Sequence, residues 1–143
     1  LEKLSKEFEL IVFTASHSCY ADPVINEIDP NRSFFSHRLY REHCIMVQDV
    51  YIKEIRLINR RMEDMVLVDN AAYSFGENIE NGIPIIPFYD YEEDNELLEL
   101  TSFLMSLKGV KDVRDEIRNE FQFRKLQEMK SLQFNEIKAL WGK

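Results

Sequence analysis

The run Met65-Val66-Leu67-Val68, followed by Asp69-Asn70, decides the expected fold. Four apolar residues without polar alternation are typical of a short buried strand in a parallel sheet. Ligands of open α/β sheets bind beyond the carboxyl ends of the strands, where this run presents a carboxylate and an amide. Asp69 and Asn70 are therefore candidate oxygen ligands for a hard cation. A simple turn after the strand is the alternative, because Asp and Asn also end strands through local hydrogen bonds.

Two other apolar runs, residues 8–13 and 83–88, predict further strands of the same sheet. The first run leads into Thr14, so a hydroxyl stands at the carboxyl end of a strand. Such a hydroxyl can donate to a phosphate oxygen, and the hydroxyls that follow it can cap the next helix. The second run contains Pro84 and Pro87, which predicts an edge or terminal strand because each proline removes a ladder donor.

The rest of the pattern predicts helices and a small β insertion. Apolar residues recur at helical spacing over residues 20–28, 97–107 and 111–139, with Gly109 as a stop between the last two segments. Residues 34–50 are less regular and predict short antiparallel strands. Strands and helices in this order indicate an α/β layered fold of Rossmann type, with a mainly parallel sheet.

Composition limits the function classes. A chain of 143 residues is long enough for one domain with a real core. Its net charge of -8 argues against a nucleic-acid surface, which needs a basic face. Cys19 and Cys44 make no disulfide framework, so reducing intracellular conditions are expected. No apolar run reaches the ~18 residues of a membrane span. There is no signal peptide, and the first residue is Leu1 rather than Met, which is compatible with a start inside a longer polypeptide.

Seven short motifs occur in one order between about residues 8 and 115. They are Phe13-Thr14-Ala15-Ser16, Tyr20-Ala21-Asp22-Pro23-Val24, Arg38-Leu39-Tyr40-Arg41-Glu42-His43-Cys44, Tyr51-Ile52-Lys53, Val68-Asp69-Asn70, Asn81-Gly82-Ile83-Pro84-Ile85 and Asp112-Val113-Arg114. In order and spacing the chain resembles the small carboxy-terminal-domain phosphatases, also called NLI-interacting-factor-like phosphatases, of the haloacid dehalogenase superfamily. The resemblance implies a haloacid-dehalogenase-like fold that removes phosphate from phosphoserine or phosphothreonine in proteins, with Mg²⁺.

The resemblance also implies roles for five residues. Thr14 would bind the transferring phosphoryl group through its hydroxyl, and Lys53 would hold the same group and offset its charge. Asp69 and Asn70 would sit at the metal, with Asn70 the better candidate for a direct ligand. Arg41, on the insertion, would lie near the phosphopeptide. These roles are consistent with phosphoryl transfer, which depends mainly on positioning and on neutralisation of charge.

One expected element has no counterpart in the chain. The family's nucleophile is the first aspartate of an Asp-x-Asp-x-Thr motif, which ends the central strand ahead of the Phe-Thr-Ala-Ser stretch. The first aspartate of this chain is Asp22, so residues 1–13 contain neither aspartate of that motif. We expect the motif outside this chain, on a strand that would pair between residues 8–13 and 65–68. Residues 1–115 would then be the carboxy-terminal part of a catalytic domain, inactive alone, and residues 116–143 a helical extension.

Two alternatives remain open. The first is a catalytically dead phosphatase-like protein that binds or scaffolds a partner. The second is a mitochondrial-import component, since one branch of this fold family serves there. The family pattern otherwise places the protein inside the cell, in nucleus or cytoplasm, and leaves its oligomeric state open. Glu54 departs from the aspartate that usually follows the family's lysine, which concerns loop geometry rather than the fold.

Overall fold

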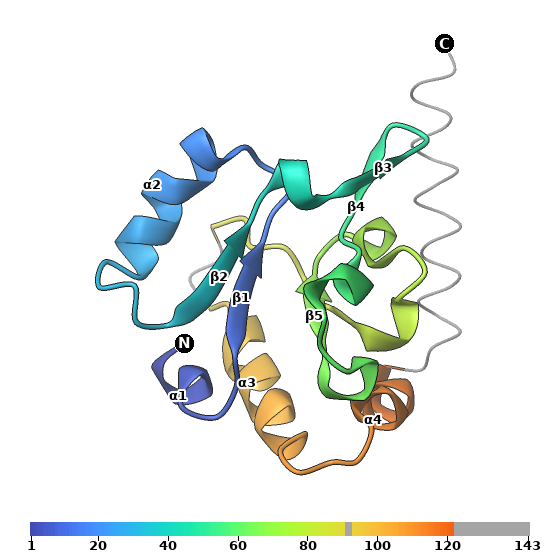
Figure 1. Ribbon diagram of the computed structural model, residues 1–143. Helices are drawn as coiled ribbons and strands as arrows, with labels where there is room; N and C mark the ends of the chain where they lie inside the picture. The colour runs from blue at the N-terminus through green and yellow to red at the C-terminus, as the bar shows by residue number, and fades with distance from the viewer. Residues whose placement is uncertain (91–92, 122–143) are drawn as a thin grey trace.

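The structure is a computed structural model that describes residues 1–90 and 93–121 (Figure 1). Its helices and strands are α1 (Glu2–Ser5), β1 (Leu10–Phe13), α2 (Ser18–Ile28), β2 (Phe35–Leu39), β3 (Ile45–Val47), β4 (Val50–Ile52), β5 (Leu67–Asp69), β6 (Gly82–Pro84), α3 (Glu96–Ser106) and α4 (Val113–Phe121). Short 3-10 helices connect them: η1 (Arg41–His43), η2 (Ile55–Ile58), η3 (Met62–Asp64), η4 (Ala72–Phe75) and η5 (Ile79–Asn81). The mixed α/β class is the one expected from the sequence.

The strands form three pairs. β1 pairs with β2 and β5 pairs with β6, both in parallel, whereas β3 and β4 form an antiparallel hairpin. The prediction that residues 34–50 form an antiparallel insertion was therefore wrong for its first half, since β2 belongs to a β1–α2–β2 unit. Parallel neighbours need such a crossover connection, and α2 supplies it. The hairpin confirms the second half of the insertion, and its turn is made by Gln48 and Asp49, both at positive φ.

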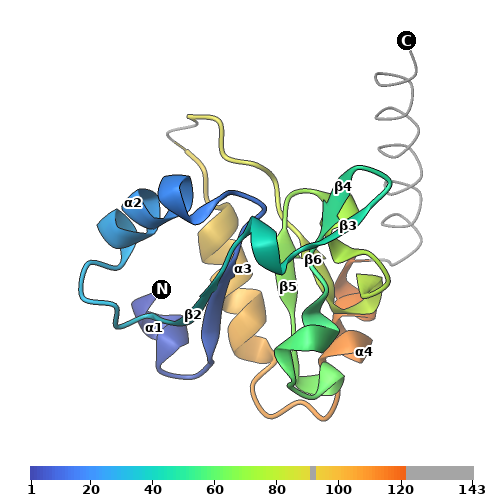
Figure 2. The ribbon, with the colours of Figure 1, turned by 45° about the horizontal axis from the view of Figure 1, so that its top comes forward.

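The two parallel pairs lie side by side with α3 behind them, in both views of the ribbon (Figures 1 and 2). A buried apolar core joins them to α3 and α4; its members are Leu4, Ile83, Leu104, Leu107, Val113 and Ile117. Leu10 of β1 and Val68 of β5 both pack against this core. The opposite face of β5 carries a second cluster, in which Leu67 contacts Ile55 and Phe75. The helices thus hold both strand pairs in one layer.

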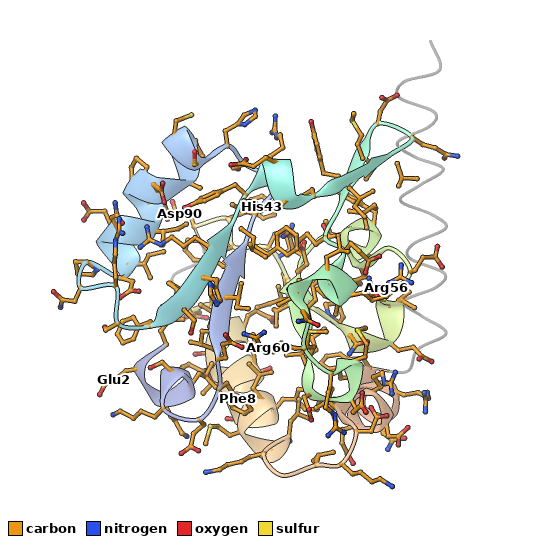
Figure 3. The ribbon with its side chains drawn as sticks, viewed as in Figure 1. Glu2, Phe8, His43, Arg56, Arg60 and Asp90 are labelled. Carbon is orange, nitrogen blue, oxygen red and sulfur yellow. The ribbon has the colours of Figure 1, made fainter. Side chains whose placement is uncertain are left out.

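The strand pairs are not bonded to each other. In the part of the chain that the structure describes, β1 hydrogen-bonds to β2 alone and β5 to β6 alone. All four residues of β1 are only partly buried, although their sequence is that of a core strand. Arg60, labelled in Figure 3, links the two halves, since its Nε and Nη2 donate to the carboxylate of Glu9 at 2.9 and 3.0 Å. Each inner strand therefore keeps one unpaired edge, which is unusual for an apolar strand.

The helices lie in the predicted segments, but the buried face of α2 and the length of β6 differ from the prediction. α2 buries Ala21 and Ile25, while Tyr20 and Val24, which carried the prediction, are 71% and 50% exposed. β6 ends at Pro84, so the strand expected over residues 83–88 is shorter, because the prolines interrupt its ladder.

The described part of the last helix is α4. This helix, Val113–Phe121, includes residue 115, where the sequence analysis expected the catalytic part to end and the helical extension to begin. Its Ile117 side chain is completely buried. The prediction for residues 122–139 lies outside the described residues. None of the described helices has the length and apolar character needed to cross a bilayer.

Candidate active site

A buried ion pair links the hairpin to the end of β5. Lys53 directly follows β4, and its backbone N–H donates to the Ser74 carbonyl of η4 at 3.0 Å. Its ammonium donates to Oδ2 of Asp69. The two side chains are 12% and 6% exposed, so both charges are largely removed from water. A lysine in such a position is held in place by its partner and points toward the carboxyl end of the β5–β6 pair.

The second oxygen of Asp69 forms the turn that ends the strand. Oδ1 accepts from the Ala71 N–H at 2.8 Å, so the simple turn considered from the sequence is present together with the ion pair. Both oxygens of this carboxylate therefore have protein partners. Asn70, the next residue, is exposed to solvent. Asn70 is open to water, and each Asp69 oxygen keeps a lone pair beyond its present bond, so both residues remain candidate oxygen ligands at this edge.

Thr14 stands just beyond the end of β1. Its N–H donates to the Leu39 carbonyl at 2.9 Å and extends the β1–β2 pairing by one bond. Its Oγ1 accepts from the Ser16 N–H at 3.1 Å, which fixes the hydroxyl in the turn that follows. A hydroxyl in this arrangement still carries its own proton and can donate it to a further acceptor.

Arg41 ties the hairpin to the end of β1. Its Nε donates to the Ala15 carbonyl at 2.6 Å, and its backbone N–H donates to the Ser16 carbonyl at 3.0 Å. The guanidinium lies 4.9 Å from the centroid of the Tyr51 ring, a cation–π distance. This residue therefore lies beside the Thr14 turn and braces β4 against it.

Cys44 lies between the two groups of candidate residues. Its Sγ is 4.0 Å from the Thr14 carbonyl oxygen, and the charges of Lys53, Arg41 and Asp69 all act on its thiol. Burial raises the pKa of Cys44, and the two cations oppose that effect only in part. Cys44 therefore contacts the Thr14 turn and also lies within reach of the charges of Lys53 and Asp69. Of the five residues proposed from the sequence, Thr14 and Lys53 directly follow β1 and β4, Asp69 and Asn70 stand at the end of β5, and Arg41 begins η1.

Glu54 is a buried carboxylate to which the sequence analysis assigned no function. It is 6% exposed, and its carboxylate accepts from the backbone N–H of Arg56 at 3.0 Å and from Asn78 Nδ2 at 2.9 Å. The Arg56 guanidinium also donates to both carboxylate oxygens, at 2.8 and 2.5 Å. These donors hold the pKa of Glu54 at about 2, against an ordinary value of 4.5. In the sequence, the position of Arg56 two residues after Glu54 was the feature from which this ion pair could have been predicted.

The described residues fit only part of a magnesium site. Among them, no group of three or more His, Cys, Asp or Glu side chains is placed to hold a metal ion. Mg²⁺ prefers six oxygen ligands in a nearly octahedral arrangement, including waters and substrate phosphate oxygens. Asn70 can contribute one of them, and Asp69 can contribute another through a lone pair that its present bonds do not use.

Comparison with known proteins decides the family. Residues 1–114 match the family model described as NLI interacting factor-like phosphatase. The chain belongs to this family. This NLI interacting factor-like phosphatase is 44% identical over 126 residues to the CTD small phosphatase-like protein 2 of Dictyostelium discoideum. The alignment covers 88% of this chain and 22% of that protein. The homologues support a phosphatase domain.

Two more distant relatives represent other branches. The chain is 34% identical over 125 residues to the CTD nuclear envelope phosphatase 1 of Xenopus tropicalis, covering 87% of this chain and 51% of that protein. It is 32% identical over 125 residues to the mitochondrial import inner membrane translocase subunit TIM50 of Candida glabrata, covering 86% of this chain and 26% of that protein. The chain therefore spans between 22% and 51% of the length of these three relatives.

Proposed function

We propose that this NLI interacting factor-like phosphatase removes phosphate from phosphoserine or phosphothreonine in proteins, with Mg²⁺, and that residues 1–143 hold only part of the catalytic machinery. The observation that carries the proposal is the buried Lys53–Asp69 pair at the end of β5, together with the turn that fixes the Thr14 hydroxyl at the end of β1. An ammonium at the carboxyl end of one parallel strand pair and a hydroxyl at the carboxyl end of the other are groups suited to a phosphoryl group.

In this proposal each residue has a separate task. Lys53 offsets the charge of the phosphoryl group, and Thr14 donates its hydroxyl proton to one of the phosphoryl oxygens. Asp69 orients Lys53 through their ion pair. Arg41, half-buried in η1 beside the hairpin, meets the phosphopeptide. Asn70 offers its amide oxygen to Mg²⁺, which when bound would neutralise phosphate charge.

The nucleophile is proposed to come from outside these 143 residues. The unpaired inner edges of β1 and β5 and the half-buried state of β1 support a central strand that completes the sheet. An Asp-x-Asp-x-Thr motif at the carboxyl end of such a strand would supply a nucleophilic aspartate and further oxygen ligands at the same edge. Without that aspartate no phospho-enzyme forms, so the chain alone is proposed to be inactive.

The test compares the 143-residue chain with an extended protein, defined as the same chain preceded by the segment that its gene encodes upstream of Leu1. With Mg²⁺ and a phosphoserine peptide, we expect no turnover by the chain and turnover by the extended protein. In the extended protein, Lys53→Ala should lower kcat/KM by on the order of 10²-fold or more, because it removes charge stabilisation of the transition state. The control is Lys111→Ala, which removes an exposed lysine at the start of α4.

The alternative function is that of a phosphatase-like binding or scaffold protein. The absence of aspartate from residues 1–13 is the observation that favours it. It predicts an upstream segment without Asp-x-Asp-x-Thr and no turnover by the extended protein under any metal condition. Equal rates for the extended protein and its Lys53→Ala variant would likewise remove Lys53 from the reaction. The proposed site of action is intracellular, which agrees with the free thiols of Cys19 and Cys44.

A further inference from the structure

A cluster of hydrogen-bonded side chains joins α2 to the end of β2, beside the candidate site, and the proposed reaction does not use it (Figure 1). Oδ1 of Asp22, on α2, accepts from the hydroxyl of Tyr40 at 2.6 Å and from Nη1 of Arg38 at 3.1 Å. Nη1 of Arg38 also donates to Oδ1 of Asn26, about one turn further along α2, at 2.8 Å. One carboxylate oxygen therefore receives donors from β2 and from the residue that follows it.

The bond between Asp22 and Tyr40 joins an ionised carboxylate to a neutral hydroxyl. It holds the pKa of Asp22 below its ordinary value, with a smaller contribution from Arg38, and it raises the pKa of Tyr40. Its length of 2.6 Å is typical of a bond from a hydroxyl to a charged oxygen, which is about twice as strong as a bond between neutral groups. The half-buried Tyr40 ring is therefore tied firmly to α2.

The backbone of Tyr40 leads directly into the turn that carries Arg41. The N–H of Tyr40 donates to Nδ1 of His43, labelled in Figure 3, at 3.0 Å and closes η1, in which Arg41 is the first residue. The Arg41 side chain is bound to the Ala15 carbonyl in the turn after β1. Arg41 is thus held from the β1 side through its own side chain and from the α2 side through Asp22 and Tyr40.

Arg38 depends on the same carboxylate. Its side chain is 13% exposed, and its Nη2 is buried without a hydrogen-bond partner in the part of the chain that the structure describes. Removing the Asp22 carboxylate would leave this cation without its ion-pair partner, which is strongly destabilising for a covered charge. Tyr40→Phe removes the hydroxyl alone and keeps the pair of Arg38 with Asp22, so it separates position from folding.

We infer that Asp22 and Tyr40 are positioning residues of the substrate site, and that their hydrogen bond sets the place from which Arg41 meets the phosphopeptide. The inference rests on the proposed function for the role of Arg41. A guanidinium has five N–H donors, and the Ala15 carbonyl takes the one on Nε, so donors remain for oxygens of the peptide. Their direction depends on where the backbone of η1 lies.

This role predicts an effect on peptide binding and not on phosphoryl transfer. The groups proposed to act on the phosphoryl group are held by other bonds: Lys53 donates to Asp69, and the Thr14 hydroxyl oxygen accepts from the turn that follows it. Loss of the Tyr40 hydroxyl should therefore leave these groups in place. A small aryl phosphate, which has no peptide to meet Arg41, should be insensitive to it.

The test measures steady-state kinetics of the extended protein with Mg²⁺, using a phosphoserine peptide and a small aryl phosphate. Tyr40→Phe should raise KM for the peptide about fivefold or more, because a bond to a charged group no longer fixes η1. It should leave kcat, and kcat/KM for the aryl phosphate, within about twofold of the parent. The matched control, Asn26→Ala, removes the other acceptor of Arg38 on the same helix and should leave both substrates within about twofold.

A double-mutant cycle tests the route through Arg41. In an Arg41→Ala background, Tyr40→Phe should have no further effect on KM, because the residue that it positions is gone. A further increase in that background overturns the inference. It is also overturned by equal effects of Tyr40→Phe and Asn26→Ala, or by equal losses with the peptide and the aryl phosphate.

Binding of the peptide separates this inference from the proposed function. Fluorescence anisotropy of a labelled phosphoserine peptide, with EDTA in place of Mg²⁺, reports affinity without turnover. If the extended protein has no activity but binds this peptide in an Arg41-dependent way that Tyr40→Phe weakens, the positioning role stands and the phosphatase does not. If Arg41→Ala changes neither KM nor this affinity, the positioning role is wrong even in an active phosphatase.

Discussion

Replacing Glu54 by Gln should destabilise the domain by an amount that depends on pH. The carboxylate of Glu54 accepts bonds from the backbone and guanidinium of Arg56 and from Asn78, and only its ionised form satisfies all of these donors. A pKa of about 2 against an ordinary 4.5 corresponds to about 3 kcal/mol of preference for the ionised form, at 1.36 kcal/mol per pKa unit. Because the Arg56 side chain is 57% exposed, solvent screening reduces the expected contribution to about 2 kcal/mol.

The sign of the pH dependence follows from the lowered pKa. The contribution of Glu54 is complete above its unfolded pKa of 4.5 and is lost as the pH falls toward about 2. The free energy of unfolding of the extended protein should therefore exceed that of its Glu54→Gln variant by about 2 kcal/mol at pH 7. The difference should shrink below about pH 4.5 and approach zero near pH 2.

The assay is urea unfolding followed by circular dichroism, at pH 7, 5, 4 and 3. Glu120→Gln, on the exposed face of α4, provides the control and should change the unfolding free energy by less than about 0.5 kcal/mol at each pH. If the difference in unfolding free energy between the parent and Glu54→Gln is the same at pH 7 and pH 3, the charge of Glu54 does not stabilise the turn. A difference below about 0.5 kcal/mol at pH 7 would refute the network itself.

Two further predictions concern packing. Gly82→Ala should lower the unfolding free energy of the extended protein by about 2 kcal/mol, because the Cβ of the new alanine would lie 2.6 Å from Cδ2 of the fully buried Phe75. A urea midpoint equal to that of the parent would contradict this prediction. The 143-residue chain alone should bind an apolar dye such as ANS and melt without a sharp transition, because the inner edges of β1 and β5 are unpaired. A cooperative, monomeric melt without dye binding would argue that no strand is missing.

The elements predicted correctly are those with a strong local signal. β1 and β5 are continuous apolar runs, and α3 has apolar residues at helical spacing before a glycine stop with φ of +77°. β2 gave no such signal because none of its five residues is buried and its sequence contains three polar residues, as expected of a strand at the outer edge of a sheet. Its parallel pairing depends on α2 packing over the β1–β2 unit, which local pattern does not encode.

For the candidate site, the sequence suggested candidate residues but did not predict their partners. The position of Thr14 and Asp69 at strand ends was readable from the chain, because hydrophobic runs stop at or just before them. That Lys53 would bond Asp69, sixteen residues later, depends on how the hairpin and η4 bring the end of β4 against β5. The bond of Asp69 to Ala71 is local, and the turn was foreseen as the simpler alternative.

The Lys53–Asp69 pair is difficult to explain by stability alone. Removing two charges from water costs several kcal/mol per ion, and replacing a buried ion pair by apolar residues is often neutral or stabilising. Both side chains are almost fully covered, at 12% and 6% exposure, so this cost applies here. A sheet that only had to fold would gain more from an apolar pair at this position. A lysine held ready at the carboxyl edge of parallel strands is useful to a protein that receives an anion there, because the ammonium is already desolvated and oriented when the phosphoryl group arrives. The energetic disadvantage of the pair is therefore the strongest physical support for the proposal that this edge receives a phosphoryl group.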